Sequence, residues 1–208
     1  FSAPKDPNIR NDGNSIVGRL KRTLYSKNGS PVLTKSMVAE VSSKLPTMQP
    51  SEIIEIGYLL TRMNRKEGWI MDPRLSAPIL SSVKPCISSL SRDQQIRLIQ
   101  VCSLSVNRNQ LKKGSKLVKS IDKMRAEVVS IILRELDGRI SDIPTCALGA
   151  LVSSLARQYD GSMAFFLSSV ACIVSDRISR VLRRPNFLIR SDLHRTVPYI
   201  LLAFVQNK

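Results

Sequence analysis

The sequence predicts an all-α fold, an α-solenoid-like array of antiparallel helical hairpins with an extended basic N-terminal arm. Apolar residues recur at three- and four-residue steps, in blocks separated by Pro, Gly or a helix-capping residue. Aromatic residues make up only 5% of the 208 residues and hydrophobic residues 43%, so the core must be largely aliphatic, which favours helices packed on helices. No two segments alternate polar and apolar residues convincingly, and we therefore expect no strand pair.

The clearest hairpin lies between Ile140 and Arg180. Ser141 is expected to be the N-cap of its first helix, because a serine hydroxyl can accept a hydrogen bond from a free N–H of the first turn. Pro144 is tolerated only near such a start. Residues 159–161 break the pattern, and Ser162 is expected to cap the second helix. The expected apolar positions are Ala147, Leu148, Leu151, Val152 and Leu155 in the first helix, and Phe165, Phe166, Val170, Ile173, Val174, Ile178 and Val181 in the second.

The chain divides into two predicted regions. Residues 1–29 contain several Pro and Gly residues and predict an extended basic arm, with a short helix over Ile16–Tyr25. The basic residues of this arm are Arg19, Lys21, Arg22 and Lys27. Residues 30–208 predict a single all-helical, repeat-like domain.

Caps and prolines predict the other helix boundaries. The expected starts are Ser30-Pro31, Pro50, Asp72-Pro73, the capping box Ser91 to Gln94, and Ser191-Asp192 before a last helix over Leu193–Gln206. A long helix should follow the polar loop 107–116 and end at Asp137-Gly138. Its expected core stripe is Leu117, Ile121, Met124, Val128, Ile131, Ile132 and Leu136.

A degenerate repeat is also predicted. Segments with the same layout of hydrophobic residue, cap and apolar helix start at Met48, Leu90, Ile140 and Leu188, which are 42, 50 and 48 residues apart. Any set of amphipathic helices gives some such alignment by chance, which is the alternative interpretation.

The stretch ALGALVSSLAR followed by MAFFLSSVACIVSDRI resembles the heptatricopeptide and octotricopeptide-type repeats of organellar RNA-binding proteins, found beside RAP domains and in FAST-kinase-like mitochondrial proteins. In that family the first helix has an apolar pair followed by Leu-x-x-Leu-Ala-Lys. The matching residues here are Ala147, Leu148, Leu151, Leu155, Ala156 and Arg157. The family's usual aromatic residue is replaced by Val152 or Ser153, and we find no RAP domain in these 208 residues. The resemblance implies a curved α-solenoid in mitochondria with an RNA-related role.

The net charge limits the partners. Lys and Arg number 32 against 16 Asp and Glu, which gives a formal charge of +16. Such an excess predicts a polyanionic partner, with nucleic acid as the first candidate and an anionic membrane surface as the second. The alternative is the generally basic character of mitochondrial matrix proteins.

Two basic clusters are the candidate contacts to RNA phosphates. The first is Lys112, Lys113, Lys116, Lys119 and Lys123, and the second is Arg177, Arg180, Arg183 and Arg184. Spacings of three and four place Lys116, Lys119 and Lys123 on one helix face, where they can follow a phosphate backbone. No aromatic residues interleave with these charges, so we expect phosphate contact to structured RNA instead of base stacking. A solvated basic face is the alternative for either cluster.

Catalytic chemistry is not expected. The sequence shows no phosphate-binding loop and no metal-ligand cluster, and its lone His194 lies in a predicted helix. Cys86, Cys102, Cys146 and Cys172 form no paired motif and are expected to be reduced core residues. We predict a non-enzymatic protein without cofactor or metal.

Location and function follow as expectations. Phe1-Ser2-Ala3 resembles the N-terminus left after removal of a mitochondrial presequence, and no apolar run is long enough to span a membrane. Together with the charge, this predicts a mitochondrial matrix protein, a structural component of the ribosome that docks on rRNA and neighbouring proteins. The alternatives are an accessory subunit of an inner-membrane respiratory or ATP-synthase complex, and a mitochondrial RNA-processing factor.

Overall fold

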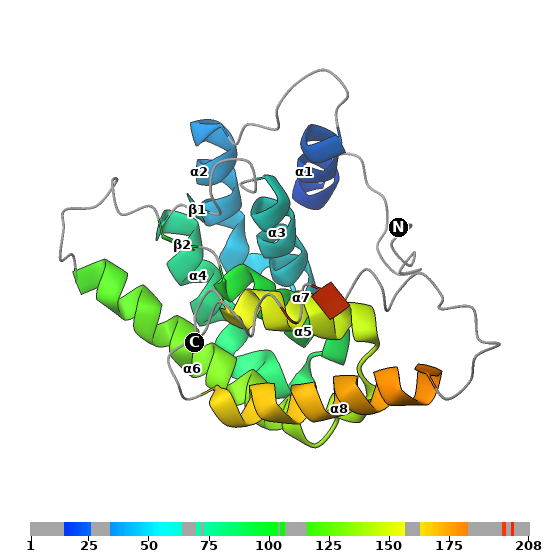
Figure 1. Cartoon of the computed structure of the whole chain (residues 1–208). Helices are drawn as coiled ribbons and strands as arrows, with labels where there is room; N and C mark the ends of the chain where they lie inside the picture. Colours follow the sequence, from blue (N-terminus) through cyan, green and yellow to red (C-terminus); the bar gives the residue numbers. More distant parts are fainter. Residues whose placement is uncertain are drawn as a thin grey trace.

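The structure, a computed structural model, is all-α apart from one short strand pair, which confirms the all-α part of the predicted fold class (Figure 1). It describes residues 15–25, 34–63, 70–71, 73–103, 105–106, 116–156, 163–182, 197–198 and 201. The helices are α1 (Ile16–Tyr25), α2 (Lys35–Lys44), α3 (Pro50–Met63), α4 (Pro73–Val83), α5 (Arg92–Cys102), α6 (Lys116–Asp137), α7 (Thr145–Ala156) and α8 (Ala164–Leu182).

Odd-numbered and even-numbered helices pack in two layers. In one layer α1 contacts α3, α3 contacts α5 and α5 contacts α7; in the other, α2 contacts α4, α4 contacts α6 and α6 contacts α8. The layers meet where α3 packs on α4, α5 on α6 and α7 on α8. A single buried cluster of mostly aliphatic side chains, drawn from all eight helices, forms the core.

The same turn leads from an even-numbered helix to the next odd-numbered one three times. A 3-10 segment follows each of α2, α4 and α6, at η1 (Leu45–Thr47), η3 (Lys84–Ser89) and η5 (Ile140–Asp142). In each turn, the carbonyl of a buried aliphatic residue accepts a hydrogen bond from the N–H three residues later. The pairs are Leu45 with Met48 (3.3 Å), Ile87 with Leu90 (3.1 Å) and Ile140 with Ile143 (3.1 Å). The later residue is extended in every case, and the next helix begins two residues after it.

This turn corrects the register of the predicted repeat. Met48 and Leu90 are equivalent, but their third counterpart is Ile143, because Ile140 occupies the position of Leu45 and Ile87. The predicted N-cap at Ser141 is wrong for the same reason: the residue lies inside η5, and α7 begins at Thr145. Leu188 and Ser162 lie outside the described residues.

Three of the other predicted helix starts are confirmed and one is wrong. Pro50 begins α3, Pro73 begins α4, and Ser91 forms the predicted capping box, with its hydroxyl accepting from Gln94 N at 3.3 Å and the Gln94 side chain accepting from Ser91 N at 2.9 Å. The start at Ser30-Pro31 is wrong, because Thr34 is extended and its hydroxyl accepts from Met37 N at 3.3 Å, so α2 begins at Lys35. The end of the long helix at Asp137-Gly138 is confirmed.

The helix expected over Ile16–Tyr25 is present and belongs to the packed structure. Ile16, Val17 and Leu20 are buried, and α1 lies against α3. For these residues the prediction of an extended arm is wrong, because the apolar face of α1 packs against α3. The other residues of the arm, Lys27 among them, lie outside the described part.

A short strand pair corrects the expectation of none. β1 (Ile70–Met71) and β2 (Ser105–Val106) pair in parallel, with Ile70 opposite Ser105. Each strand has only two residues, which is too short for any alternation to appear in the sequence.

Several predicted core positions are exposed. Leu117 is 40% exposed and Phe165 is 73% exposed, and both lie in the first turn of a helix. Of the four free cysteines only Cys102 is buried, Cys86 is half-buried, and Cys146 and Cys172 are exposed. Conversely, the polar residues Gln95 and Arg125 are buried. Of the last predicted helix, the structure describes only Val197, Pro198 and Leu201.

Candidate nucleic-acid interface

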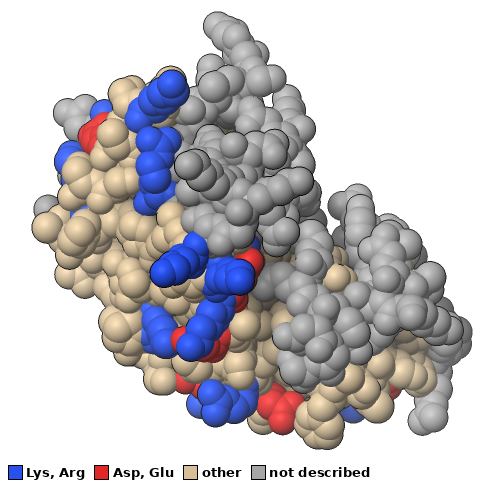
Figure 2. Space-filling view, turned by 90° about the vertical axis from the view of Figure 1, so that its left-hand side faces the viewer, with Lys and Arg blue, Asp and Glu red and all other residues tan. Residues whose placement is uncertain are grey.

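The N-terminal half of α6 carries a row of solvent-exposed lysines. Lys116, Lys119 and Lys123 are exposed on one side of the helix, while Ile121 and Val128 on the other side are fully buried. None of the three lysines forms an ion pair with an acidic residue in the part of the chain that the structure describes. Figure 2 shows Lys and Arg side chains gathered on the face that includes α6, with fewer Asp and Glu among them. The positive charge on this side of α6 is therefore available to a partner.

Lys84 extends this surface from α6 onto η3. Its Nζ donates to Glu127 Oε2 at 2.5 Å, and Lys123 lies one turn before Glu127 on α6. The hydrogen bond from Lys84 is the main reason that the pKa of Glu127 lies below its ordinary value, and the charges of Lys84 and Lys123 lower it further. Lys84 pairs with the Glu127 carboxylate, and Lys123 adds a second positive charge one turn away without an ion pair of its own in the described part of the chain, so the surface stays positive.

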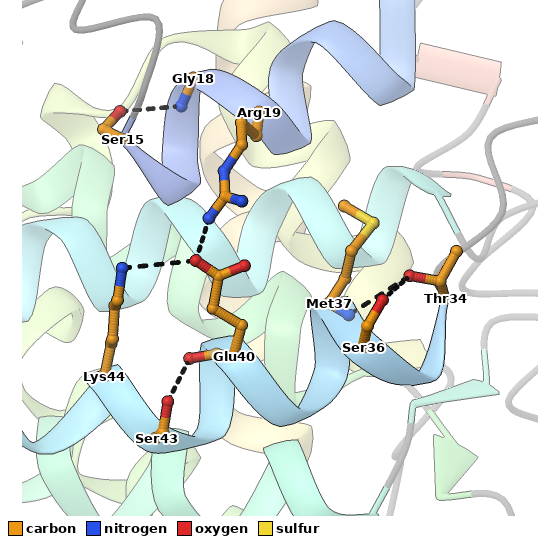
Figure 3. A network of polar contacts seen from close by, with 9 residues as sticks. All are labelled: Ser15, Gly18, Arg19, Thr34, Ser36, Met37, Glu40, Ser43 and Lys44. Atoms are coloured by element: carbon orange, nitrogen blue, oxygen red, sulfur yellow. Dashed lines mark hydrogen bonds and ion pairs between the residues drawn. The ribbon is translucent and has the colours of Figure 1, made fainter.

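The basic residues of α1 have acidic partners on neighbouring helices. Arg19 donates to the Glu40 carboxylate of α2, which also receives Lys44 Nζ at 3.3 Å (Figure 3). The pKa of Glu40 is lowered, with the Arg19 hydrogen bond as the largest cause. Lys21 pairs with Glu55 of α3 at 3.2 Å. Arg22 is exposed. Arg19 and Lys21 thus join α1 to α2 and α3.

The basic residues of α8 are also engaged within the chain. Arg177 donates from Nη1 to Thr145 Oγ1 at 2.9 Å and from Nη2 to Ser141 O at 2.7 Å, which ties α8 to the start of α7. Arg180 pairs with Asp176, one turn earlier, at 2.5 Å. The other predicted contacts, Lys112, Lys113, Arg183 and Arg184, lie outside the described residues. Among the predicted site residues that the structure describes, Lys116, Lys119 and Lys123 are therefore the group that is exposed on one helix face without an ion pair.

Two arginine–tyrosine pairs on the odd-numbered layer were missed by sequence reasoning. The Arg97 guanidinium lies 5.2 Å from the Tyr58 ring centre and pairs with Glu55 at 2.6 Å. Arg62 lies 5.6 Å from the Tyr25 ring centre and donates to its hydroxyl at 2.9 Å. Glu55 and Arg97 are 42 residues apart, which equals the spacing of the first predicted repeat. This equal spacing could have indicated from the sequence that the two residues are neighbours.

Metal-ligand groups and the cysteine thiols were considered as sites of chemistry in the sequence, and the structure describes both. No group of three or more His, Cys, Asp or Glu side chains that could hold a metal ion occurs among the described residues. Burial raises the pKa of Cys102 to about 12, with a small opposing effect from Arg125, so its thiol stays protonated. No helix in the described part combines the length and apolar character needed to cross a membrane.

Comparisons with known proteins add no family. No protein-family model matches the chain, and neither a curated protein nor a solved structure matches it. The resemblance to organellar helical repeats therefore stays a prediction.

Proposed function

We propose that this protein is a non-catalytic component of the mitochondrial ribosome that docks on rRNA through α6, and on neighbouring proteins through its other helical faces. The observation that carries the proposal is the contrast among its basic residues. Arg19, Lys21 and Arg177 are engaged within the fold, whereas Lys116, Lys119 and Lys123 are exposed without an acidic partner among the described residues.

The geometry of the α6 lysines suits a phosphate backbone. At a rise of about 1.5 Å per residue, Lys116 to Lys123 covers roughly 10 Å along one side of the helix. A nucleic-acid strand presents several phosphates over that length. No aromatic side chain lies on this side of α6, so these three lysines contact the backbone.

The helical framework supports the same proposal. Two layers of alternating helices, joined by a turn that recurs three times, are the arrangement expected if antiparallel hairpins stack as an α-solenoid. We propose that arrangement here. Such arrays bury a core between repeats and leave long outer faces for large partners.

Binding to structured RNA tests the proposal. The triple variant Lys116→Gln, Lys119→Gln, Lys123→Gln should bind an rRNA hairpin at least about tenfold more weakly at moderate salt, and its salt slope should fall by about 2 to 3. Fluorescence anisotropy over a salt series measures both quantities.

A matched variant controls for net charge. The control variant Lys35→Gln, Lys44→Gln, Arg180→Gln also loses three positive charges, but from exposed positions on α2 and α8. Its affinity for the rRNA hairpin should stay within about twofold of wild type. Equal losses in the two variants would contradict a site on α6. Tighter binding to cardiolipin vesicles than to RNA would favour the membrane-complex alternative.

A further inference from the structure

A polar pocket opens beside the C-terminal half of α6. It has a volume of about 270 Å³ and lies between η3, the start of α5 and the end of α6. Its lining residues are Ser88, Leu90, Arg92, Gln95, Glu135 and Arg139. The pocket continues the seam in which η3 runs beside α6, since Lys84 meets Glu127 and Ser88 meets Glu135 in the same order.

The Glu135 carboxylate is held in place on one wall of this pocket. Its Oε1 accepts from Ser88 Oγ at 2.5 Å, and its Oε2 accepts from Gln95 Nε2 at 2.5 Å. Gln95 Nε2 also donates to Ile87 O at 3.2 Å. Because each carboxylate oxygen has two lone pairs, both can still accept from a ligand.

Two guanidinium groups supply positive charge. Arg92 donates from Nη1 to Asp142 O at 3.1 Å, and its Nε is buried without a hydrogen-bond partner among the described residues. Arg139 is exposed, and no acidic side chain in the described ranges lies within ion-pair distance of it. With one carboxylate and two arginines in its lining, the pocket suits a ligand that has an anionic group and hydrogen-bond donors.

The repeat shows that the core does not require this polarity. Gln95 is the fourth residue of α5, and the fourth residues of α3 and α7 are Ile53 and Leu148. All three side chains are buried, at 6%, 2% and 0% exposure. A buried amide costs free energy that an aliphatic side chain does not. At this one turn the buried amide instead donates to Glu135 and so fixes a carboxylate in the wall of the pocket.

We infer that the pocket binds a guanine nucleotide, and, resting on the proposed function, that the nucleotide belongs to the docked RNA. Guanine carries its N1–H and N2–H donors side by side, which matches the two oxygens of a fixed carboxylate. Arg92 and Arg139 face the phosphate, because guanidinium groups bind phosphate oxygens well. Glu135 lies twelve residues after Lys123, about 18 Å along α6 and about 120° around it, and the docked strand would pass from one place to the other around the helix.

Short oligonucleotides test this inference. The full chain should bind UUGUU about tenfold more tightly than UUAUU, as expected for one bidentate base contact. Glu135→Gln should abolish that preference without weakening UUAUU, and Arg139→Gln should weaken both oligonucleotides. Asp137→Asn, which removes the same charge from an exposed position nearby on α6, should leave the preference intact.

Three results would overturn the inference. These are equal binding of the two oligonucleotides by wild type, loss of the preference in Asp137→Asn, and an unchanged preference in Glu135→Gln with native circular dichroism. Free guanosine monophosphate that binds as tightly as UUGUU would overturn the assignment to RNA. The lysine triple variant keeps the two proposals separate, because it tests hairpin affinity and not the choice between G and A.

Discussion

Helices α1 and α6 both carry basic residues on an amphipathic helix, yet the fold uses those residues differently. On α1, Arg19 and Lys21 meet Glu40 and Glu55 of the neighbouring helices. On the first half of α6, the lysines point away from the core and meet no described acidic partner before Glu127. The comparison teaches that carboxylates on packed neighbours engage one basic cluster, whereas the other cluster stays exposed.

The largest expected effect concerns the structural role of α1. Leu20 is 1% exposed in the contact with the core, so Leu20→Ala should lower the free energy of unfolding by about 3 kcal/mol. Urea denaturation followed by circular dichroism measures this. Leu117→Ala on α6, where the side chain is 40% exposed, should cost well under half as much. If both substitutions lowered the free energy of unfolding by the same small amount, α1 would not be part of the packed core.

The second prediction gives α6 the acidic partner that α1 already has. Ser120 is exposed four residues after Lys116, so Ser120→Glu creates an i, i+4 pair worth a few tenths of a kcal/mol. RNA affinity should fall about threefold to tenfold because a carboxylate now occupies the phosphate path. Anisotropy with the rRNA hairpin measures the fall. Ser36→Glu on α2, an equally exposed site, should not change the affinity by more than about twofold, and an equal fall there would argue against the α6 site.

The smallest effect is a pH dependence of stability. The folded-state pKa values of Glu40 and Glu127 lie below the ordinary 4.5. Each carboxylate therefore contributes stability that is complete above the unfolded pKa and is lost as the pH falls through the folded value. The double variant Glu40→Gln, Glu127→Gln should show a shallower loss of stability than wild type as the pH falls below about 5. Thermal melts at a series of pH values measure the two slopes, and parallel curves would contradict the pairing.

The sequence predicted those features that depend on neighbouring residues. Pro50 and the Ser91 capping box mark helix starts correctly, because the residues that start a helix act within a single turn. Ser141 failed because a good cap residue can also lie in a 3-10 turn, and only the packing of Ile140 and Ile143 into the core decides between the two.

The candidate site was less predictable because it depends on distant partners. The spacing of Lys116, Lys119 and Lys123 was sufficient to place them on one face, whereas the pairing of Arg97 with Glu55 joins residues 42 positions apart. The pocket is assembled from still more distant contacts, with Ser88 and Glu135 separated by 47 positions. A pattern within one helix cannot predict which distant residues will pair.

Sedimentation of mitochondrial lysate tests the central claim most directly. Cells would express tagged wild type, the α6 lysine variant or the matched charge variant, and gradients would be run with and without ribonuclease. The account predicts that wild type and the matched variant migrate with a ribosomal subunit, that ribonuclease abolishes this migration, and that the α6 variant stays near the top. Ribonuclease-insensitive migration of all three proteins with a detergent-extracted membrane complex would contradict it.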